Sequence, residues 1–200
     1  MKKIPTLFNR IYENHKIVGI TPDITPGCEE AFIHGTATVK LDGSCCAVIN
    51  GEFYKRYDCK KGKRPPEGAI PCCDPDPVTG HWPHWVKVDE SDPADKHFRA
   101  AFITTIQEIE RISGLAKIPD GTYEAIGVHF QGNPYNAPID MIARHGSTFI
   151  EVARDFESIK KCLEENEIEG LVFWLAGEPV CKIKRTDFGL PWPVKKGDKE

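Results

Sequence analysis

Short apolar segments that alternate with turn residues constrain the fold of this chain more than any other feature. Between residues 36 and 57, two dipeptides, Asp42-Gly43 and Asn50-Gly51, separate three such segments. Both are strong signals for β-hairpins, because their residues accept the positive φ angles of a tight turn. Strands so short and so closely spaced pair with their neighbours in sequence, which predicts an antiparallel sheet here.

The rest of the chain continues this pattern and adds two helices. From residue 95 to 115, apolar side chains recur at the spacing of one helix face, and Gly114 follows as a stop signal. A second helix is predicted from Asp155, its N-cap, to residue 166. Further strands are predicted at 121–128, 141–143, 148–152, 170–175 and 180–184, with edge strands and loops at 1–27. We expect one α+β domain over 1–200, with an irregular insertion at 59–98 and a charged tail at 194–200.

The composition gives no overall electrostatic reason to bind nucleic acid. The 200 residues are enough for one large domain or two small ones, and 40% of them are hydrophobic, which is typical of a globular fold. The formal net charge is -4, so a nucleic-acid partner must be bound by a local basic patch. The most basic run is Lys60-Lys61-Gly62-Lys63-Arg64, which by itself is typical of a solvated loop.

Hydropathy and cysteine usage bear on the cellular setting. No apolar stretch approaches the length of a membrane span, and the first residues lack a signal-peptide core, so we expect no membrane association. The eight cysteines include the adjacent pairs Cys45-Cys46 and Cys72-Cys73, which are poorly placed for disulfides and favour free thiols in a cytoplasmic setting. The spacing His81-x-x-His84 raises the question of zinc, but without a Cys-x-x-Cys pair we favour packing histidines.

Charged residues within or beside apolar strands are the most informative positions for function. Lys182 and Lys184 are two residues apart, so on a strand both ammonium groups point to one face while Ile183 points to the core. Two adjacent cations are unfavourable unless an anion lies between them, and a phosphate is the most economical anion. Beside the predicted Asp42-Gly43 turn, partial desolvation and nearby cations favour the neutral, nucleophilic amine of Lys40. Taken alone, each feature is more typical of a solvated edge strand or a surface lysine.

Four such segments occur in a set order and together resemble a known family. The chain is similar to the covalent nucleotidyltransferases, which comprise ATP-dependent polynucleotide ligases and capping enzymes. The matching segments are Lys40-Leu41-Asp42-Gly43, Tyr123-Glu124-Ala125-Ile126-Gly127, Glu169-Gly170-Leu171-Val172-Phe173 and Lys182-Ile183-Lys184. Three more resemble the compact 5′–3′ RNA ligases that include a vertebrate member, namely Gly80-His81-Trp82-Pro83, Gln131-Gly132-Asn133-Pro134-Tyr135 and Asp187-Phe188-Gly189-Leu190-Pro191-Trp192-Pro193.

The resemblance implies a nucleotidyltransferase fold of the ATP-grasp-like adenylation type, with antiparallel sheets flanked by helices. It implies an ATP-dependent RNA ligase that joins 5′-phosphate and 3′-hydroxyl RNA ends through a lysyl-AMP intermediate on Lys40, with Mg²⁺ or Mn²⁺ as cofactor. Lys182 and Lys184 are then expected to neutralise phosphate charge and to depress the amine pKa of Lys40. Glu169 is expected to hold the metal ion or to orient Lys40.

Four further positions receive roles from the same resemblance. Glu124 is expected to accept hydrogen bonds from ribose hydroxyls, Arg56 to contact ribose or phosphate, and Asp42 to support the geometry of the site. The family usually supplies an aromatic ring that stacks on adenine after the third segment. Met141-Ile142-Ala143 offers none, so Phe149 is the candidate in this chain.

Fifteen residues follow Arg185, so we expect no OB-fold domain of the kind that DNA ligases and capping enzymes append. This favours RNA ligation over capping. The alternatives are a DNA-nick ligase, a GTP-dependent guanylyltransferase, and a catalytically inactive nucleotide- or RNA-binding module. We expect ATP and RNA ends as partners, and we infer no obligate protein partner.

Overall fold

A computed structural model describes residues 3–194, and the chain divides into two compact units. One unit is a single stretch of chain, residues 42–145, which we call the continuous unit. The other combines residues 3–41 with the described residues from 146 onward, and we call it the discontinuous unit. A division of this kind is compatible with one domain or two, so the single domain over residues 1–200 stays a prediction. The predicted tail at 194–200 lies outside the described residues except for its first position.

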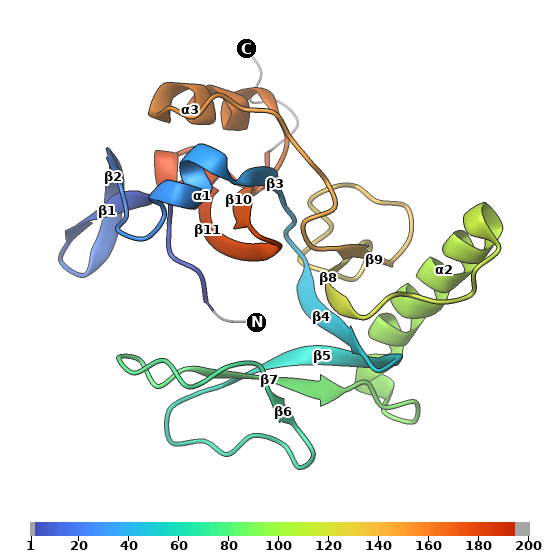
Figure 1. Ribbon diagram of the computed structural model, residues 1–200. Coiled ribbons are helices and arrows are strands. Elements are labelled where there is room, and N and C mark those ends of the chain that lie inside the picture. Colours follow the sequence, from blue (N-terminus) through green and yellow to red (C-terminus); the bar gives the residue numbers. More distant parts are fainter. Residues whose placement is uncertain (1–2, 195–200) are drawn as a thin grey trace. The chain divides into compact units, whose positions relative to one another are not determined.

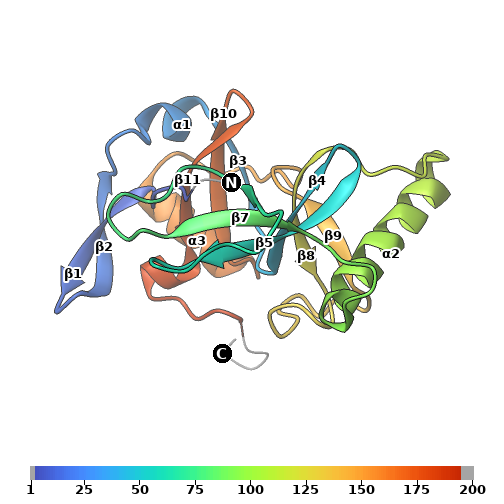
Figure 2. The ribbon, with the colours of Figure 1, turned by 90° about the horizontal axis from the view of Figure 1, so that it is seen from below.

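The continuous unit contains a sheet with the strand order β6-β7-β5-β4-β8-β9, counted over the described residues. Its strands are β4 (Ser44–Ile49), β5 (Glu52–Cys59), β6 (Ile70–Pro71), β7 (Trp82–Lys87), β8 (Gly121–Ile126) and β9 (Met141–Arg144). All of these pairings are antiparallel, and β5 and β7 run side by side (Figure 2). Asn50 and Gly51 join β4 to β5 with φ angles of 53° and 78°, which confirms the second predicted hairpin.

Helix α2 (Lys96–Ser113) covers one face of this sheet and lies beside β9 (Figure 1). A short 3-10 turn, η1 (Pro93–Asp95), precedes it, and Gly114 ends it in the left-handed conformation. The rings of Phe53 and Phe102 stack with their centroids 4.6 Å apart, which joins the helix to β5. The predicted helix at 95–115 is therefore confirmed within two residues at its C-terminal end.

The discontinuous unit contains two smaller sheets in the described part of the chain. The first is the hairpin of β1 (Phe8–Glu13) and β2 (Lys16–Ile24). The second has the order β11-β10-β3, from β3 (Thr36–Lys40), β10 (Gly170–Leu175) and β11 (Glu178–Lys184). Its pairings are antiparallel, and Ala176 and Gly177 form the turn between β10 and β11, as predicted.

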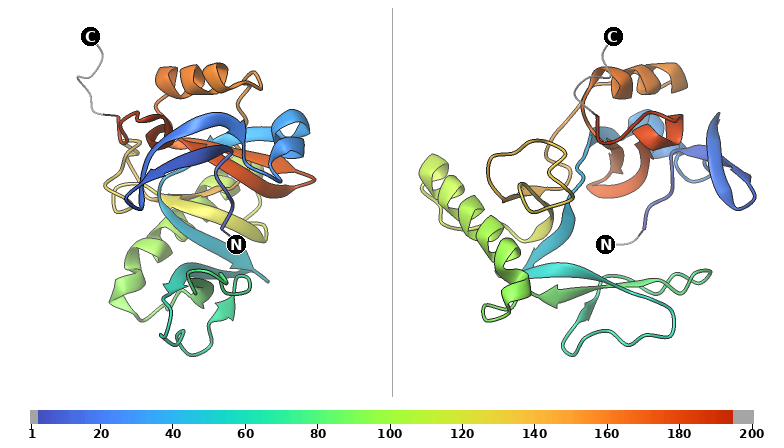
Figure 3. Two further views of the ribbon diagram at one scale, coloured as in Figure 1. Left: turned by 90° about the vertical axis from the view of Figure 1, so that its left-hand side faces the viewer. Right: turned by 180° about the vertical axis from the view of Figure 1, so that it is seen from behind.

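One face of this second sheet packs against helices α1 (Glu29–His34) and α3 (Phe156–Glu165), which lie on the same side of β10 and β11 (Figures 1 and 3). Odd-numbered residues of β10 and β11 point into this core. The buried side chains include Phe32, Ile159, Leu163, Leu171, Phe173 and Ile183. Asp155 caps α3 by accepting a hydrogen bond from the Ser158 amide at 2.8 Å, as its sequence predicts. The opposite face of the sheet is left for polar residues.

The predicted hairpin at Asp42-Gly43 is wrong, although the strands on either side of it exist. β3 pairs with β10, whereas β4 pairs with β5 and β8. Neither Asp42 nor Gly43 has the positive φ angle of a hairpin turn. A Cβ atom on Gly43 would lie 2.1 Å from the backbone oxygen of Ala125, so glycine is required there for close packing against β8. The dipeptide marks the boundary between the two units.

Two other sequence predictions are corrected. The stretch at 59–98 is not irregular throughout, because Trp82 to Lys87 form β7, which has partners on both sides. The strand predicted at 148–152 is reduced to a bridge between Phe149 and Thr38, held by two backbone hydrogen bonds to β3. The α+β class with antiparallel sheets is confirmed. Among the described residues, no helix is both long and apolar enough to cross a membrane.

Candidate active site

The polar face of the sheet β11-β10-β3 holds the predicted lysines. Register places Lys40, Gly170 and Lys184 in one row across the three strands. Because directly opposed residues share a face of a sheet, Lys40 and Lys184 project from the same side. Lys182 lies on this side too, two residues before Lys184, while Ile183 between them is fully buried. The predicted common face of Lys182 and Lys184 is confirmed.

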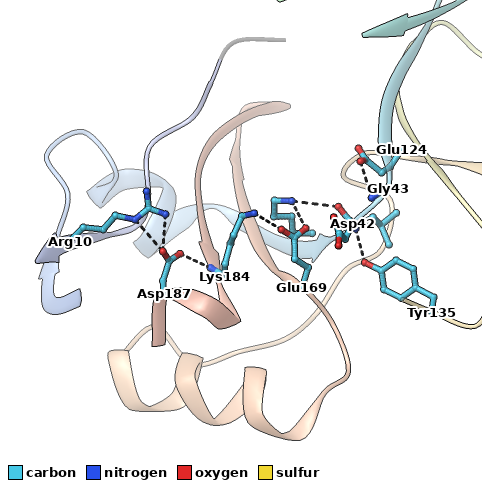
Figure 4. Close-up of polar contacts among 10 residues, drawn as sticks. Arg10, Asp42, Gly43, Glu124, Tyr135, Glu169, Lys184 and Asp187 are labelled. Atoms are coloured by element: carbon cyan, nitrogen blue, oxygen red, sulfur yellow. Dashed lines mark hydrogen bonds and ion pairs between the residues drawn. The ribbon is translucent and has the colours of Figure 1, made fainter. Parts of the chain in front are cut away.

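Glu169 supplies the anion between these cations. Its side chain is almost entirely buried, and it comes immediately before β10. One carboxylate oxygen forms an ion pair with the Lys40 ammonium, and the other accepts from Lys184 Nζ at 2.5 Å (Figure 4). Gly170, between the two lysines in the row, has no room for a side chain, because a Cβ atom would lie 2.1 Å from the Ile183 oxygen. In this dipeptide, Glu169 therefore forms the ion pairs with the two lysines, and Gly170 permits the close packing of β10 against β11.

Lys182 is a cation of this face whose pKa is lowered. Burial, followed by the charges of Lys40 and Lys184, lowers its pKa from 10.5 to about 8. Within residues 3–194 its side chain makes no ion pair. An anion that binds to this face would therefore contact Lys182, which forms no ion pair with a carboxylate among the described residues.

Two residues that sequence reasoning missed extend this arrangement. Asp187, in the short helix η2 (Arg185–Phe188), accepts a hydrogen bond from the Lys184 amide at 2.9 Å. Its other oxygen accepts from Arg10 Nη2 at 2.7 Å and from Arg10 Nε at 3.1 Å (Figure 4). Asp187 is buried, so this pairing fixes the end of β11 that carries Lys184. Asp187 begins one of the segments that resemble RNA ligases, whereas nothing in the sequence marks Arg10.

Glu124 is the centre of a separate set of contacts in the continuous unit. It lies on β8, and Oε1 accepts a hydrogen bond from the Gly43 amide at 3.1 Å (Figure 4). Its Oε2 lies 2.8 Å from His145 Nε2, and the other ring nitrogen of His145 lies 3.0 Å from the hydroxyl of Thr122. The chain positions His145 directly after β9, which pairs with β8. That register is not visible in the sequence, so the role of His145 was not predicted.

The backbone of Asp42 is held from another direction. Its amide donates to the hydroxyl of Tyr135 at 2.6 Å (Figure 4). Tyr135 belongs to the Gln131–Tyr135 segment that resembles RNA ligases. Gly43 and Asp42 are thus both anchored through their amides, which keeps the start of β4 in one conformation. This contact is consistent with a supporting role for Asp42.

Cys45 lies opposite Glu124 in the β4–β8 register. Its sulfur, a Glu124 oxygen and a His145 nitrogen lie within 4.8 Å of one another. Burial and the charge of Glu124 raise the pKa of the Cys45 thiol to about 12. The thiol is therefore protonated at neutral pH, and a protonated thiol is a poor metal ligand.

The last two predicted positions are Arg56 and Phe149. Arg56 lies on β5 and pairs through Nε with Asp58 at 2.8 Å, and the same Asp58 oxygen lies 3.2 Å from His81 Nε2. Phe149 is 71% exposed, and its backbone bridges to Thr38 on β3. Trp174, which the sequence reasoning did not single out, shares the polar face of the sheet, and its indole donates to the Thr38 hydroxyl at 2.8 Å. The role of Phe149 stays a prediction.

Comparison with known proteins defines the class. A sequence model of RNA ligase 1 matches residues 71–198, well over half of the chain, and the chain therefore belongs to the RNA ligase 1 family. RNA ligase 1 of Danio rerio is 27% identical to it, over 87% of this chain and 74% of the relative. RNA ligase 1 of Mus musculus is 25% identical, over 80% of this chain and 69% of the relative. The predicted resemblance to RNA ligases is confirmed.

The family match and the site overlap in part. The matched range contains Glu124, Glu169, Lys182 and Lys184. It begins after Lys40, Asp42 and Arg56, which are the earliest of the predicted site residues.

Proposed function

We propose that this chain is an ATP-dependent RNA ligase that uses Lys40 as its nucleophile and has a nucleotidyltransferase fold. Membership of the RNA ligase 1 family supports the ligation of RNA. The observation that carries the finer proposal is the pairing of Glu169 with both Lys40 and Lys184 on one sheet face. A surface lysine has no need of a buried carboxylate partner, whereas a lysine that must be aimed at one phosphorus atom does.

In the first step, the Lys40 amine attacks the α-phosphorus of ATP. A P–N bond forms, the bond from that phosphorus to the bridging oxygen breaks, and pyrophosphate leaves. The Lys40 ammonium must first lose a proton to solvent to become nucleophilic, and its nitrogen loses a second proton to solvent once the P–N bond has formed. Glu169 holds the Lys40 side chain in place, so that the direction of attack is set before the substrate arrives. Orienting Lys40 is the role for Glu169 that its contacts favour.

Lys182 and Lys184 neutralise the negative charge that develops on the phosphate oxygens in this step. Both project from the face that carries Lys40. Lys184 is fixed by Glu169 and, through its amide, by Asp187. Fixed cations stabilise developing negative charge without reorganisation during the reaction, which is the largest contribution in many enzymes.

The remaining positions act on the nucleotide outside its reacting phosphate. Glu124 keeps lone pairs beyond its bonds to Gly43 and His145, and we propose that they accept ribose hydroxyls. Arg56 contacts ribose or phosphate, Asp42 supports the site, and Phe149 stacks on adenine. The exposed ring of Phe149 is compatible with a base-stacking role.

We propose that Mg²⁺ or Mn²⁺ accompanies ATP. Glu169 is a carboxylate in contact with Lys40, and Mg²⁺ commonly binds through one or two carboxylates together with substrate phosphates and water. The donor set therefore fits such an ion when phosphate oxygens are present. Bound there, it would supply positive charge beside the phosphates, and Glu169 would be its protein ligand.

The later steps transfer AMP to an RNA 5′-phosphate and then expel it when a 3′-hydroxyl attacks that phosphate. The product is a phosphodiester, and AMP leaves with the bonding electrons of the P–O bond that breaks. RNA ends are therefore the proposed partners. The unpaired state of all eight cysteines supports a reducing, cytoplasmic location.

The deciding experiment is intact mass spectrometry after incubation with ATP and Mg²⁺. We expect the wild-type chain to gain the mass of one AMP, and Lys40→Ala to lose this product by at least about 10³-fold, because removal of a nucleophile removes the whole covalent pathway. Lys160→Ala is the matched control, since Lys160 is a half-exposed lysine of α3 in the same unit. A wild-type chain that binds ATP without releasing pyrophosphate would instead be an inactive binding module. Addition of GMP from GTP would identify a guanylyltransferase, and sealing of nicked DNA but not RNA would identify a DNA ligase.

A further inference from the structure

We propose a zinc site on the continuous unit, formed by His97, His129 and Asp140. His97 lies in the first turn of α2, His129 follows β8, and Asp140 immediately precedes β9. Three segments far apart in sequence thus bring two imidazoles and one carboxylate together. One ligand atom from each lies within 4.8 Å of the other two. This site is independent of the proposed ligase chemistry.

The distances fit a shared ion. His129 Nδ1 lies 2.7 Å from Asp140 Oδ2, and His97 Nδ1 lies 3.9 Å from the same oxygen. Zinc binds imidazole nitrogen and carboxylate oxygen at about 2.0–2.2 Å, so two ligand atoms of one ion lie roughly 3–4 Å apart. The shorter separation lies just below that range, and the longer one lies within it. A small adjustment of the partly exposed imidazoles would bring both into the range.

The carboxylate is held in place by the backbone around it. Asp140 is buried, and its Oδ1 accepts a hydrogen bond from the His129 amide at 3.0 Å. Its Oδ2 is consequently directed at the imidazoles. Gly127 makes this possible, since a Cβ atom there would lie 2.6 Å from Asp140 Oδ1. The oxygen that would ligate the ion is therefore fixed by the fold, as a metal site requires.

Hydrogen bonding alone does not explain why the imidazole rings of His97 and His129 lie so close together. Their rings stack with centroids 3.7 Å apart and an interplanar angle of 19°. Two imidazolium rings so close would repel each other, and one carboxylate carries a single negative charge. A metal ion bound by both rings and by the carboxylate would account for this close approach.

The donor set selects the ion. Two imidazole nitrogens and one carboxylate suit Zn²⁺ and similar borderline cations, whereas Mg²⁺ prefers oxygen ligands throughout. The side chains of His97 and His129 are 34% and 48% exposed, so water can complete the coordination. An ion here would tie the first turn of α2 to the segment between β8 and β9. That segment also contains Tyr135, which holds the amide of Asp42.

Isothermal titration of the chelator-treated full chain with Zn²⁺ tests the proposal, with Mg²⁺ as the competing ion. We expect one Zn²⁺ per chain at this site, unaffected by millimolar Mg²⁺. His129→Ala should weaken binding by at least about tenfold, because the loss of even an outer-shell partner of a metal site costs 10–100-fold in affinity. His81→Ala is the matched control, since His81 also faces a carboxylate but belongs to no cluster of three ligand residues within the described part of the chain. Its affinity should equal that of the wild type.

Nitrogen-15 spectra of the imidazole rings separate this site from binding to thiols. Zinc should shift the Nδ1 signals of His97 and His129 and leave those of His81 in place. Asp140→Asn is the second variant, because an asparagine oxygen can still accept from the His129 amide while the charge is lost. If Zn²⁺ fails to bind, binds without shifting His97 and His129, or binds Asp140→Asn and His129→Ala as tightly as the wild type, the proposal is wrong.

Discussion

Two glutamates, one in each unit, are held in different ways: Glu124 lies within β8, and Glu169 immediately precedes β10. Glu169 of the discontinuous unit contacts two ammonium groups and is almost fully buried. Glu124 of the continuous unit contacts a backbone amide and an imidazole. Both are packed next to a glycine whose Cβ atom would collide with backbone, Gly170 in one case and Gly43 in the other.

The difference lies in what each carboxylate balances. Around Glu169 the cations Lys40, Lys182 and Lys184 outnumber the carboxylate, so the negative charge itself is essential to that face. Around Glu124 the partners fix the geometry of neighbouring backbone, and a neutral side chain of the same shape preserves one of the two bonds. A single change, glutamate to glutamine, therefore separates a charge-balancing role from a hydrogen-bonding role.

Glu169→Gln is expected to have the larger effect. Without the carboxylate charge, Lys40 and Lys184 lose the anion that pairs with both of them, and breaking a buried pair commonly costs about 3–5 kcal/mol. Because the lysines are partly exposed, we expect a loss of about 3 kcal/mol in the free energy of unfolding. Urea unfolding measures this loss of stability, and Glu169→Gln should also form less of the AMP adduct than the wild type. The matched control is Glu178→Gln, an exposed glutamate at the start of β11. Equal stability of the two variants would contradict a charge-balancing role for Glu169.

Lys182 gives the second prediction, through pH. Its pKa is about 8 in the folded chain, and an anion bound beside it raises that pKa again. Binding then takes up a proton, so the affinity for a non-hydrolysable ATP analogue should fall as pH rises through about 8. If the anion raises the pKa by about one unit, the fall is about tenfold, since one unit corresponds to 1.36 kcal/mol. Titration calorimetry in buffers from neutral to alkaline pH measures it.

Lys182→Arg is the control for this profile, because arginine stays charged throughout that range. Its affinity should lack the step near pH 8 and otherwise resemble the wild type. Stability should depend on pH in the opposite direction. Because folding lowers the pKa of Lys182, the free energy of unfolding should rise as the pH increases above about 8. If the affinity of the wild-type chain for the analogue is independent of pH, or rises with pH, Lys182 does not contact the phosphates.

Elements whose signals are local were predictable from the sequence. Helices α2 and α3 follow from apolar residues at helical spacing, from the N-cap Asp155 and from Gly114. The shared face of Lys182 and Lys184 follows from the two-residue period of a strand, and the order of the four motif segments indicated the family. Each of these signals lies within a few residues of the feature that it specifies.

Features that depend on long-range pairing were not predictable. The Asp42-Gly43 dipeptide is typical of a hairpin, but close packing of Gly43 against Ala125 decides its conformation. β7 was overlooked because proline and histidine interrupt its apolar pattern, although partners on both sides hold it. His145 and Arg10 were missed for the same reason, since their partners Glu124 and Asp187 are distant in sequence. A sequence shows which residue types are present but not the register that brings them together.

The smallest expected effect, and the sharpest test of the contrast, comes from Glu124→Gln. The glutamine oxygen can still accept from the Gly43 amide, so the main loss is the charged contact to His145, and we expect about 1 kcal/mol in the free energy of unfolding. Glu124→Ala should cost more, because it also leaves the Gly43 amide without its acceptor. At position 169 the order should differ, with glutamine and alanine nearly equal, since charge rather than shape is lost there. Glu52→Gln is the control, as Glu52 is an exposed residue paired with Lys87 at 2.6 Å. If glutamine and alanine were equal at 124 as well, Glu124 would be a charge-balancing residue, and the two units would use their glutamates in the same way.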